Sequence, residues 1–71
     1  MWKELQHYKK DVKTNGLSGK DRRYYQWDHT HNDIEVYSGT GKRQHLGSMD
    51  PKTGRIYKEA VKGRFLDKKY W

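Results

Sequence analysis

Side chains capable of acid–base chemistry are concentrated in one short stretch of this 71-residue chain. Residues 28–35 contain three carboxylates and two imidazoles but no lysine or arginine: Asp28, His29, His31, Asp33 and Glu35. The rest of the chain carries all 16 Lys and Arg and the other six of its nine acids, so this stretch is an acidic island in a basic protein. Like charges this close repel each other unless a cation or a function holds them together, which favours a catalytic cluster.

Carboxylate, imidazole and surrounding positive charge are the groups that metal-independent cleavage of RNA requires. A base removes the proton of a 2′-hydroxyl as it attacks the adjacent phosphorus, an acid protonates the leaving 5′-oxygen, and a cation stabilises the developing charge. We expect Glu35 to be the base and His31 the acid or electrostatic stabiliser, although these two roles can be exchanged. Asp28 is expected to orient His31.

Two other interpretations of the island stay open. Its polar side chains can form the solvent face and turn of a hairpin in a non-catalytic module that binds RNA or ribosomes. Alternatively, His29 and His31 can be metal ligands on one face of a strand, as in a metal-dependent nuclease. A complete site of that kind needs three or four ligands, and the chain has no cysteine.

Composition indicates one small domain with an aromatic core. The mean hydropathy is −1.44, but three Trp, six Tyr and one Phe each provide a large area to bury. A net charge of +7 and a pI near 9.7 indicate a polyanionic partner, with nucleic acid first. No apolar run is long enough for a signal peptide or a membrane span, so we expect a soluble monomer that does not bind membranes itself.

The N-terminal part is expected to be helical. Trp2, Leu5, Tyr8 and Val12 recur at spacings of three and four, which predicts a short amphipathic helix over residues 2–12, ended by Asn15-Gly16. Residues 1–18 would then be this helix and a linker, and residues 19–71 a catalytic sheet.

From Arg22 the apolar period changes to two, which predicts strands. Tyr25 and Trp27 would share one face while Tyr24, Gln26 and Asp28 share the other. After a turn at 29–32, Ile34 and Val36 would oppose Asp33, Glu35 and Tyr37, and the face with the acids is expected to be wet.

Three further segments complete the predicted sheet. After a turn at 38–41, residues 43–49 form a third strand with Leu46 in the core. Asp50-Pro51-Lys52-Thr53-Gly54 has the residues of a tight turn in the required order. Residues 55–59 form a fourth strand, and residues 65–71 a last strand or short helix. The fold class is therefore α+β, mainly β, with an N-terminal helix on an antiparallel sheet of about four to five strands.

Two blocks and the chain end resemble a known family. These are Tyr25 to Tyr37 with Trp27-Asp28, His31 and Glu35, the run from Gln44 to Gly54, and the ending Lys68-Lys69-Tyr70-Trp71. They resemble the cytotoxic ribonuclease domain of the ribosome-cutting colicins and cloacin. The resemblance covers the chain from roughly Gly19 to its end.

This resemblance implies a C-terminal toxin domain with a highly twisted antiparallel sheet and an N-terminal helix, and we expect no cofactor. It implies one cut in the decoding site of small-subunit ribosomal RNA, after delivery into the cytoplasm of a target bacterium. The implied partners are the ribosome and an acidic immunity protein that protects the producer.

The resemblance also assigns residues. Asp28, His31 and Glu35 take the family's catalytic places, and Arg64 is the counterpart of its essential arginine. The segment after Arg64 is one residue longer than usual and Gly63 separates Arg64 from Lys62, so Lys62 is the alternative for this cation. The expected substrate contacts are Tyr25, Asp33, Tyr37, Arg43, Lys58 and Lys62, with Asp33 where a glutamate is usual.

Overall fold

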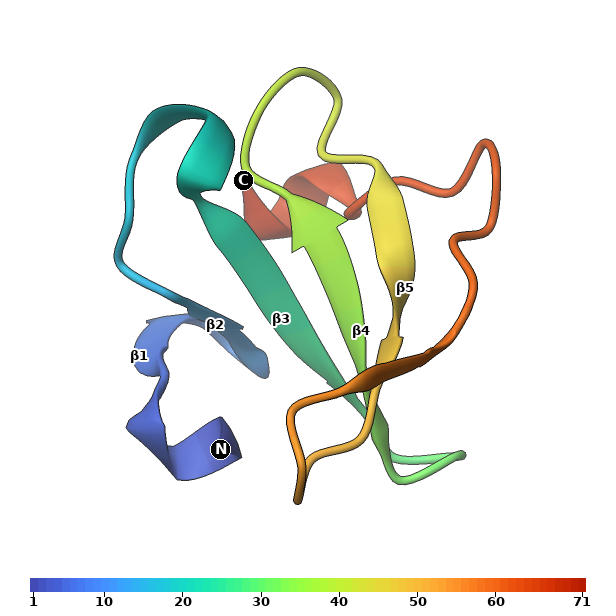
Figure 1. Ribbon diagram of the computed structural model, residues 1–71. Coiled ribbons are helices and arrows are strands. Elements are labelled where there is room, and N and C mark those ends of the chain that lie inside the picture. Colours follow the sequence, from blue (N-terminus) through green and yellow to red (C-terminus); the bar gives the residue numbers. More distant parts are fainter.

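The computed structural model describes residues 1–71, which form a single antiparallel sheet (Figure 1). The strands lie side by side in chain order, so each pairs with the next one along the chain. They are β1 (Gln6–Lys9), β2 (Val12–Thr14), β3 (Arg23–Asp28), β4 (Asp33–Ser38), β5 (His45–Met49) and β6 (Ile56–Lys58). The expectation of a mainly β protein is confirmed, with six strands instead of four to five. None of its helices is both long and apolar enough to cross a membrane.

The predicted N-terminal helix is wrong. Only Trp2–Glu4 is helical, as the single 3-10 turn η1, and a hairpin of β1 and β2 follows, with Lys10 at a φ of +48° in its turn. β2 pairs with the outer edge of β3, where Val12 lies opposite Gln26 and is fully buried. A short helix with a thin apolar face is marginal by itself, whereas this pairing supplies both backbone hydrogen bonds and burial.

The central hairpin has the faces that the sequence predicts. In the β3–β4 register Gln26 lies opposite Glu35 and Asp28 opposite Asp33, so the acids share one face. The expectation that this face is wet is wrong, because Asp33 and Glu35 are both buried. The reason is that β5, β6 and the segment after them cover it with their own polar side chains.

The turn at residues 50–54, strand β5 and the chain end lie where the sequence predicts them. Asp50 Oδ1 accepts hydrogen bonds from the amides of Lys52 and Thr53, and Gly54 has a φ of +74°, as the tight turn requires. On β5 the fully buried side chain is His45, while Leu46 is only partly buried, which corrects the predicted core residue by one position. The chain ends in a short 3-10 helix, η3 (Lys68–Tyr70), the second of the two forms expected.

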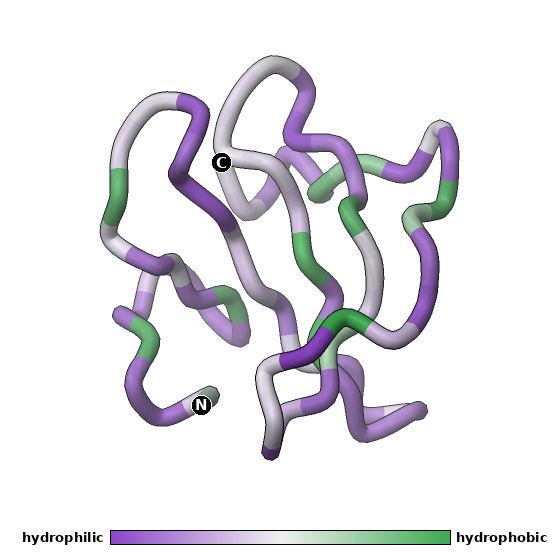
Figure 2. Tube along the Cα trace, in the orientation of Figure 1, coloured by the Kyte–Doolittle hydropathy of each residue, from purple (hydrophilic) through white to green (hydrophobic).

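Each face of the sheet has its own small core. One combines side chains of β2, β3 and β4 with the C-terminal segment: Val12, Tyr24, Tyr37, Leu66 and Tyr70. The other combines β3, β4 and β5 with Trp2 and Leu5 of the N-terminal segment: Tyr25, Ile34, Val36 and Met49. Figure 2 accordingly shows short apolar stretches separated by polar ones along the trace. The two chain ends therefore cover opposite faces of one sheet.

A cation holds the C-terminus in place. The guanidinium of Arg43 lies 4.3 Å from the ring centre of Tyr24 and 4.5 Å from that of Trp71. Trp71 donates its indole N–H to the carbonyl of Leu66, and Tyr8 donates its hydroxyl to the carbonyl of Trp71. A guanidinium this close to two aromatic rings is attracted to both of them. Arg43 is thus part of the fold, and its expected contact with a substrate stays a prediction.

Gly47 on β5 offers a test of how closely β6 approaches. A Cβ at this position would lie 2.6 Å from the carbonyl oxygen of Lys58, and the φ of Gly47 is +143°. We expect Gly47→Ala to lower the free energy of unfolding by about 2 kcal/mol or more, because a backbone atom must move. Gly41→Ala, which enters open space at a φ of +59°, should cost about 1 kcal/mol. Equal losses in urea titrations of the two variants would contradict this packing.

Candidate active site

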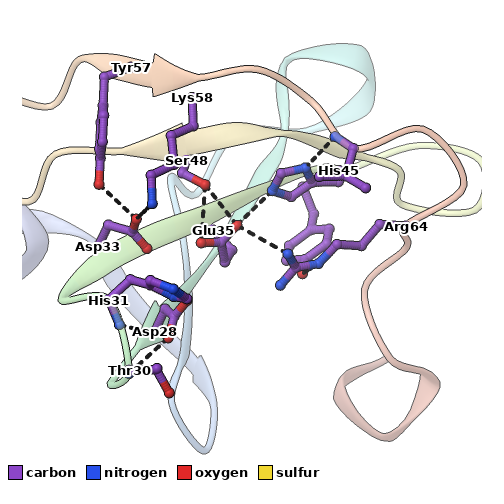
Figure 3. A network of polar contacts seen from close by, with 12 residues as sticks. Asp28, Thr30, His31, Asp33, Glu35, His45, Ser48, Tyr57, Lys58 and Arg64 are labelled. Carbon is purple, nitrogen blue, oxygen red and sulfur yellow. Dashed lines mark hydrogen bonds and ion pairs between the residues drawn. The ribbon is translucent and has the colours of Figure 1, made fainter.

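Glu35, in the middle of β4, is the centre of a polar network (Figure 3). Its Oε1 accepts hydrogen bonds from His45 Nε2 at 2.7 Å and from Ser48 Oγ at 2.9 Å, and lies 3.5 Å from a terminal nitrogen of Arg64. Its Oε2 is within 3.1 Å of the same Ser48 hydroxyl. Because one hydroxyl hydrogen is shared between both oxygens, Oε2 keeps a lone pair that can accept a proton.

His45 is held as one defined tautomer. Its Nδ1 lies 2.9 Å from the amide nitrogen of Val61, which can only donate, so Nδ1 is the acceptor. The proton is therefore on Nε2 and points at Glu35. The sequence analysis singled out neither His45 nor Ser48 as a functional residue. Their only signal was their position inside the run from Gln44 to Gly54 that carries the family resemblance.

Arg64 reaches this site from the segment that follows β6. The amide of His45 donates to the carbonyl of Arg64, and the side chain of Arg64 donates through Nε to the Tyr37 hydroxyl at 3.1 Å. Burial raises the pKa of Tyr37, so this phenol stays neutral and accepts. The Arg64 side chain is 44% exposed, which leaves N–H groups for a ligand. Lys62 is exposed and pairs with no acid, so Arg64 is the cation brought to Glu35.

Asp28 and His31 form a second pair at the turn between β3 and β4. Asp28 Oδ1 accepts from the amides of Thr30 and His31, and Oδ2 lies 2.9 Å from His31 Nδ1. The hydrogen bond from His31 holds the pKa of Asp28 below its ordinary value. The imidazole is 61% exposed, so its Nε2 is free to meet a substrate.

Asp33 is buried beside this pair. It is 1% exposed, and its Oδ2 accepts from the Tyr57 hydroxyl at 2.7 Å and from Lys58 Nζ at 3.1 Å. Burial alone would raise the pKa of Asp33, but the hydrogen bonds from Tyr57 and Lys58 outweigh it and lower the pKa. The bond to Asp33 raises the pKa of Lys58 in turn. Asp33 is thus buried against Tyr57 and Lys58 of β6, and its expected contact with a substrate stays a prediction.

The remaining expected substrate contacts divide in two. Tyr25 packs in the core on the opposite face of the sheet with Ile34 and Val36, so the structure does not bring it to the site. Tyr37 is buried and accepts a hydrogen bond from Arg64, whereas Lys58 is half exposed beside Asp33.

An open cleft of about 320 Å³ joins the two parts of the site. It is lined by Gln26, Trp27, Asp28, His29, Thr30, Glu35 and Arg64. His29 therefore stands on its wall, while His31 lies just outside the lining. A base, a cation and an oriented imidazole around one polar cleft can carry out proton transfer at a phosphoryl group.

The same cluster has three carboxylates that a divalent cation prefers as ligands. Oxygens of Asp28, Asp33 and Glu35 lie within 4.8 Å of one another. Each carboxylate already contacts a donor of the protein: His31, Lys58 and Arg64 respectively.

Acid should weaken the fold through Asp33. Because its pKa is lower in the folded chain, its stabilising contribution is present above the unfolded pKa of about 4 and is lost as the pH falls through the folded value. We expect the urea midpoint to fall less between about pH 6 and about pH 3 in Asp33→Asn than in the wild type. Asp21→Asn, at an exposed and unpaired position, should keep the wild-type dependence. An unchanged acid response of Asp33→Asn would contradict the assignment.

Comparisons with known proteins agree on one family. The Cytotoxic family matches residues 3–67. Three Escherichia coli proteins align over 39 residues, which make up 55% of this chain and 7% of each relative: colicin E3 is 49% identical, colicin E6 46% and cloacin 44%. The chain thus corresponds to a small part of these relatives. No solved structure matches it. The family match covers nearly the whole chain and includes every residue of the cleft. This chain therefore belongs to the Cytotoxic family.

Proposed function

We propose that the chain is a toxin endoribonuclease that cuts small-subunit ribosomal RNA at the decoding site without a metal ion. One observation carries the proposal: Glu35 and Arg64 share a cleft with Asp28, which holds His31, inside a chain of net charge +7. The family and the names of its relatives, colicins and cloacin, support a bacterial toxin.

In the proposed reaction the scissile phosphate lies against Arg64. Oε2 of Glu35 accepts the proton of the 2′-hydroxyl, whose oxygen forms a bond to phosphorus, and the bond from phosphorus to the 5′-oxygen breaks. Nε2 of His31 donates the proton that the 5′-oxygen needs. The products are a 2′,3′-cyclic phosphate and a free 5′-hydroxyl.

Each supporting residue has a physical task in this scheme. Asp28 aligns His31, and the N–H of His45 together with the hydroxyl of Ser48 fixes the Glu35 carboxylate. The Arg64 guanidinium remains charged throughout and offers several N–H groups to the equatorial oxygens of the phosphoryl group.

The partners follow from charge and from the family. We infer that the target is the ribosome and that an acidic immunity protein neutralises the basic surface in the producing cell. The domain would act in the cytoplasm of the target bacterium after delivery as part of a larger toxin.

The cation is tested by two matched variants. Arg64→Lys should lower the cleavage rate by about 100-fold or more, because a point charge does not replace a planar fork of donors held by Tyr37 and Glu35. Lys62→Ala should cut ribosomes at close to the wild-type rate. The reverse outcome, measured as the yield of a discrete ribosomal RNA fragment, would move the role to Lys62.

The nucleophile is tested with a short RNA that carries the target loop. We expect cleavage in excess EDTA, and none when a single 2′-deoxy nucleotide replaces the one before the cut, because its hydroxyl is the attacking group.

Other results would favour the rival functions. A nuclease that uses the Asp28, Asp33 and Glu35 oxygens to bind a metal ion would fail in EDTA and cut the deoxy substrate when metal is restored. A non-catalytic module would bind the RNA with a steep salt dependence and leave it intact.

A further inference from the structure

A second polar and aromatic surface lies away from the catalytic cleft. Two neighbouring hollows of about 550 and 370 Å³ share Lys42 and Phe65 in their walls. The larger extends to Thr40 and Gln44 after β4, and the smaller to Lys68 and Trp71 at the chain end. We call the surface formed by these residues the Phe65 groove.

Strand-like pairing places Phe65 in this groove. Gln44 and Phe65 form an antiparallel bridge, and the amides of His45 and Leu66 bond on either side of it. Neighbouring side chains of an extended segment point to opposite faces. Arg64 bonds to Tyr37 and Leu66 is buried in the core that contains Tyr37, so the Phe65 side chain between them points outward and stays 43% exposed.

The groove has the chemistry of a site for unpaired nucleotides. Phe65 and Trp71, the latter 40% exposed, offer aromatic surface, and Lys42 Nζ lies 5.9 Å from the Phe65 ring centre. Lys68 adds a second positive charge, and neither hollow has a carboxylate in its wall. Aromatic rings between lysines stack bases and neutralise phosphates.

We propose that the Phe65 groove binds a single-stranded segment of the RNA substrate outside the nucleotides that react. A base stacks on Phe65, and Lys42 and Lys68 contact the flanking phosphates. The amide of Gln44 and the hydroxyl of Thr40 can hydrogen-bond base edges.

This inference rests on the proposed function for its substrate, but it also requires the RNA to be long enough to reach both surfaces. Arg64 and Phe65 are adjacent in the chain, but the Phe65 groove shares no wall residue with the catalytic cleft, so one RNA must pass the edge formed by residues 64–66 to contact both. A substrate that is too short to pass this edge gains nothing from the groove.

The first experiment compares substrates of two lengths. Phe65→Leu keeps an apolar side chain and removes the aromatic face. We expect it to raise KM for a long RNA about fivefold to a hundredfold with kcat unchanged, and to leave cleavage of a dinucleotide unaffected. Phe65→Trp should restore the wild-type KM. Equal losses on both substrates would mean that the substitution acts through neighbouring Arg64, and no loss on either would mean that the groove is unused; both outcomes overturn the proposal.

The second experiment does not depend on catalysis. Binding of polyuridylate is measured by titration of Glu35→Gln, with and without Phe65→Leu, so a failure of the proposed reaction leaves this measurement intact. We expect the second substitution to weaken polyuridylate binding and to leave binding of polyglutamate unchanged. Equal weakening of both polyanions would assign the groove to an acidic protein and overturn the proposal, as would an unchanged affinity for polyuridylate.

A matched pair of lysine variants tests the phosphate contacts. Lys42→Gln should reduce the slope of log affinity for polyuridylate against log salt by about one. Lys20→Gln removes the same charge from the exposed turn η2 (Gly19–Asp21) and should leave that slope unchanged. Equal slopes for the two variants would overturn the proposed contact.

Discussion

A carboxylate buried in the middle of a single-layer sheet needs hydrogen-bond donors and a compensating charge, and the later part of this chain supplies them. Glu35 has almost no access to water, and an unpaired buried charge is strongly destabilising. Its donors come from β5, as His45 and Ser48, and from the segment after β6, as Arg64. Asp33 is buried in the same way, and its donors, Tyr57 and Lys58, come from β6. The last third of the chain is therefore tied to β4 by charge compensation as much as by apolar contact.

A one-layer sheet has two faces to cover and only 71 residues to cover them. The N-terminal segment packs on one face, and the C-terminal segment, fastened by Arg43 between Tyr24 and Trp71, packs on the other. The cover on the second face stops short of the turn between β3 and β4. This leaves a polar cleft where Asp28, Glu35 and Arg64 meet, so the candidate site is the part of that face that the small core does not fill.

Local sequence was sufficient for much of the fold and for part of the site. Alternation placed Asp28 and Glu35 on one face of a hairpin, and the residues from Asp50 to Gly54 defined their turn. The Asp28–His31 pair spans three residues, so the turn chemistry of the aspartate alone is enough to form it. Interactions of this range depend on backbone preferences that each short segment carries with it.

Tertiary structure decided the rest, because burial and pairing depend on partners far along the chain. The apolar spacing of residues 2–12 fits a helix. These residues instead contribute to a β1–β2 hairpin, because β2 pairs with the free edge of β3. Nothing in the sequence around His45 shows that Val61 and Glu35 fix its tautomer. That Arg64 rather than Lys62 lies beside Glu35 likewise depends on the path of the final segment. The sequence by itself determined which residues could do chemistry, and only the packing of β5, β6 and the chain end on β4 determined which of them meet.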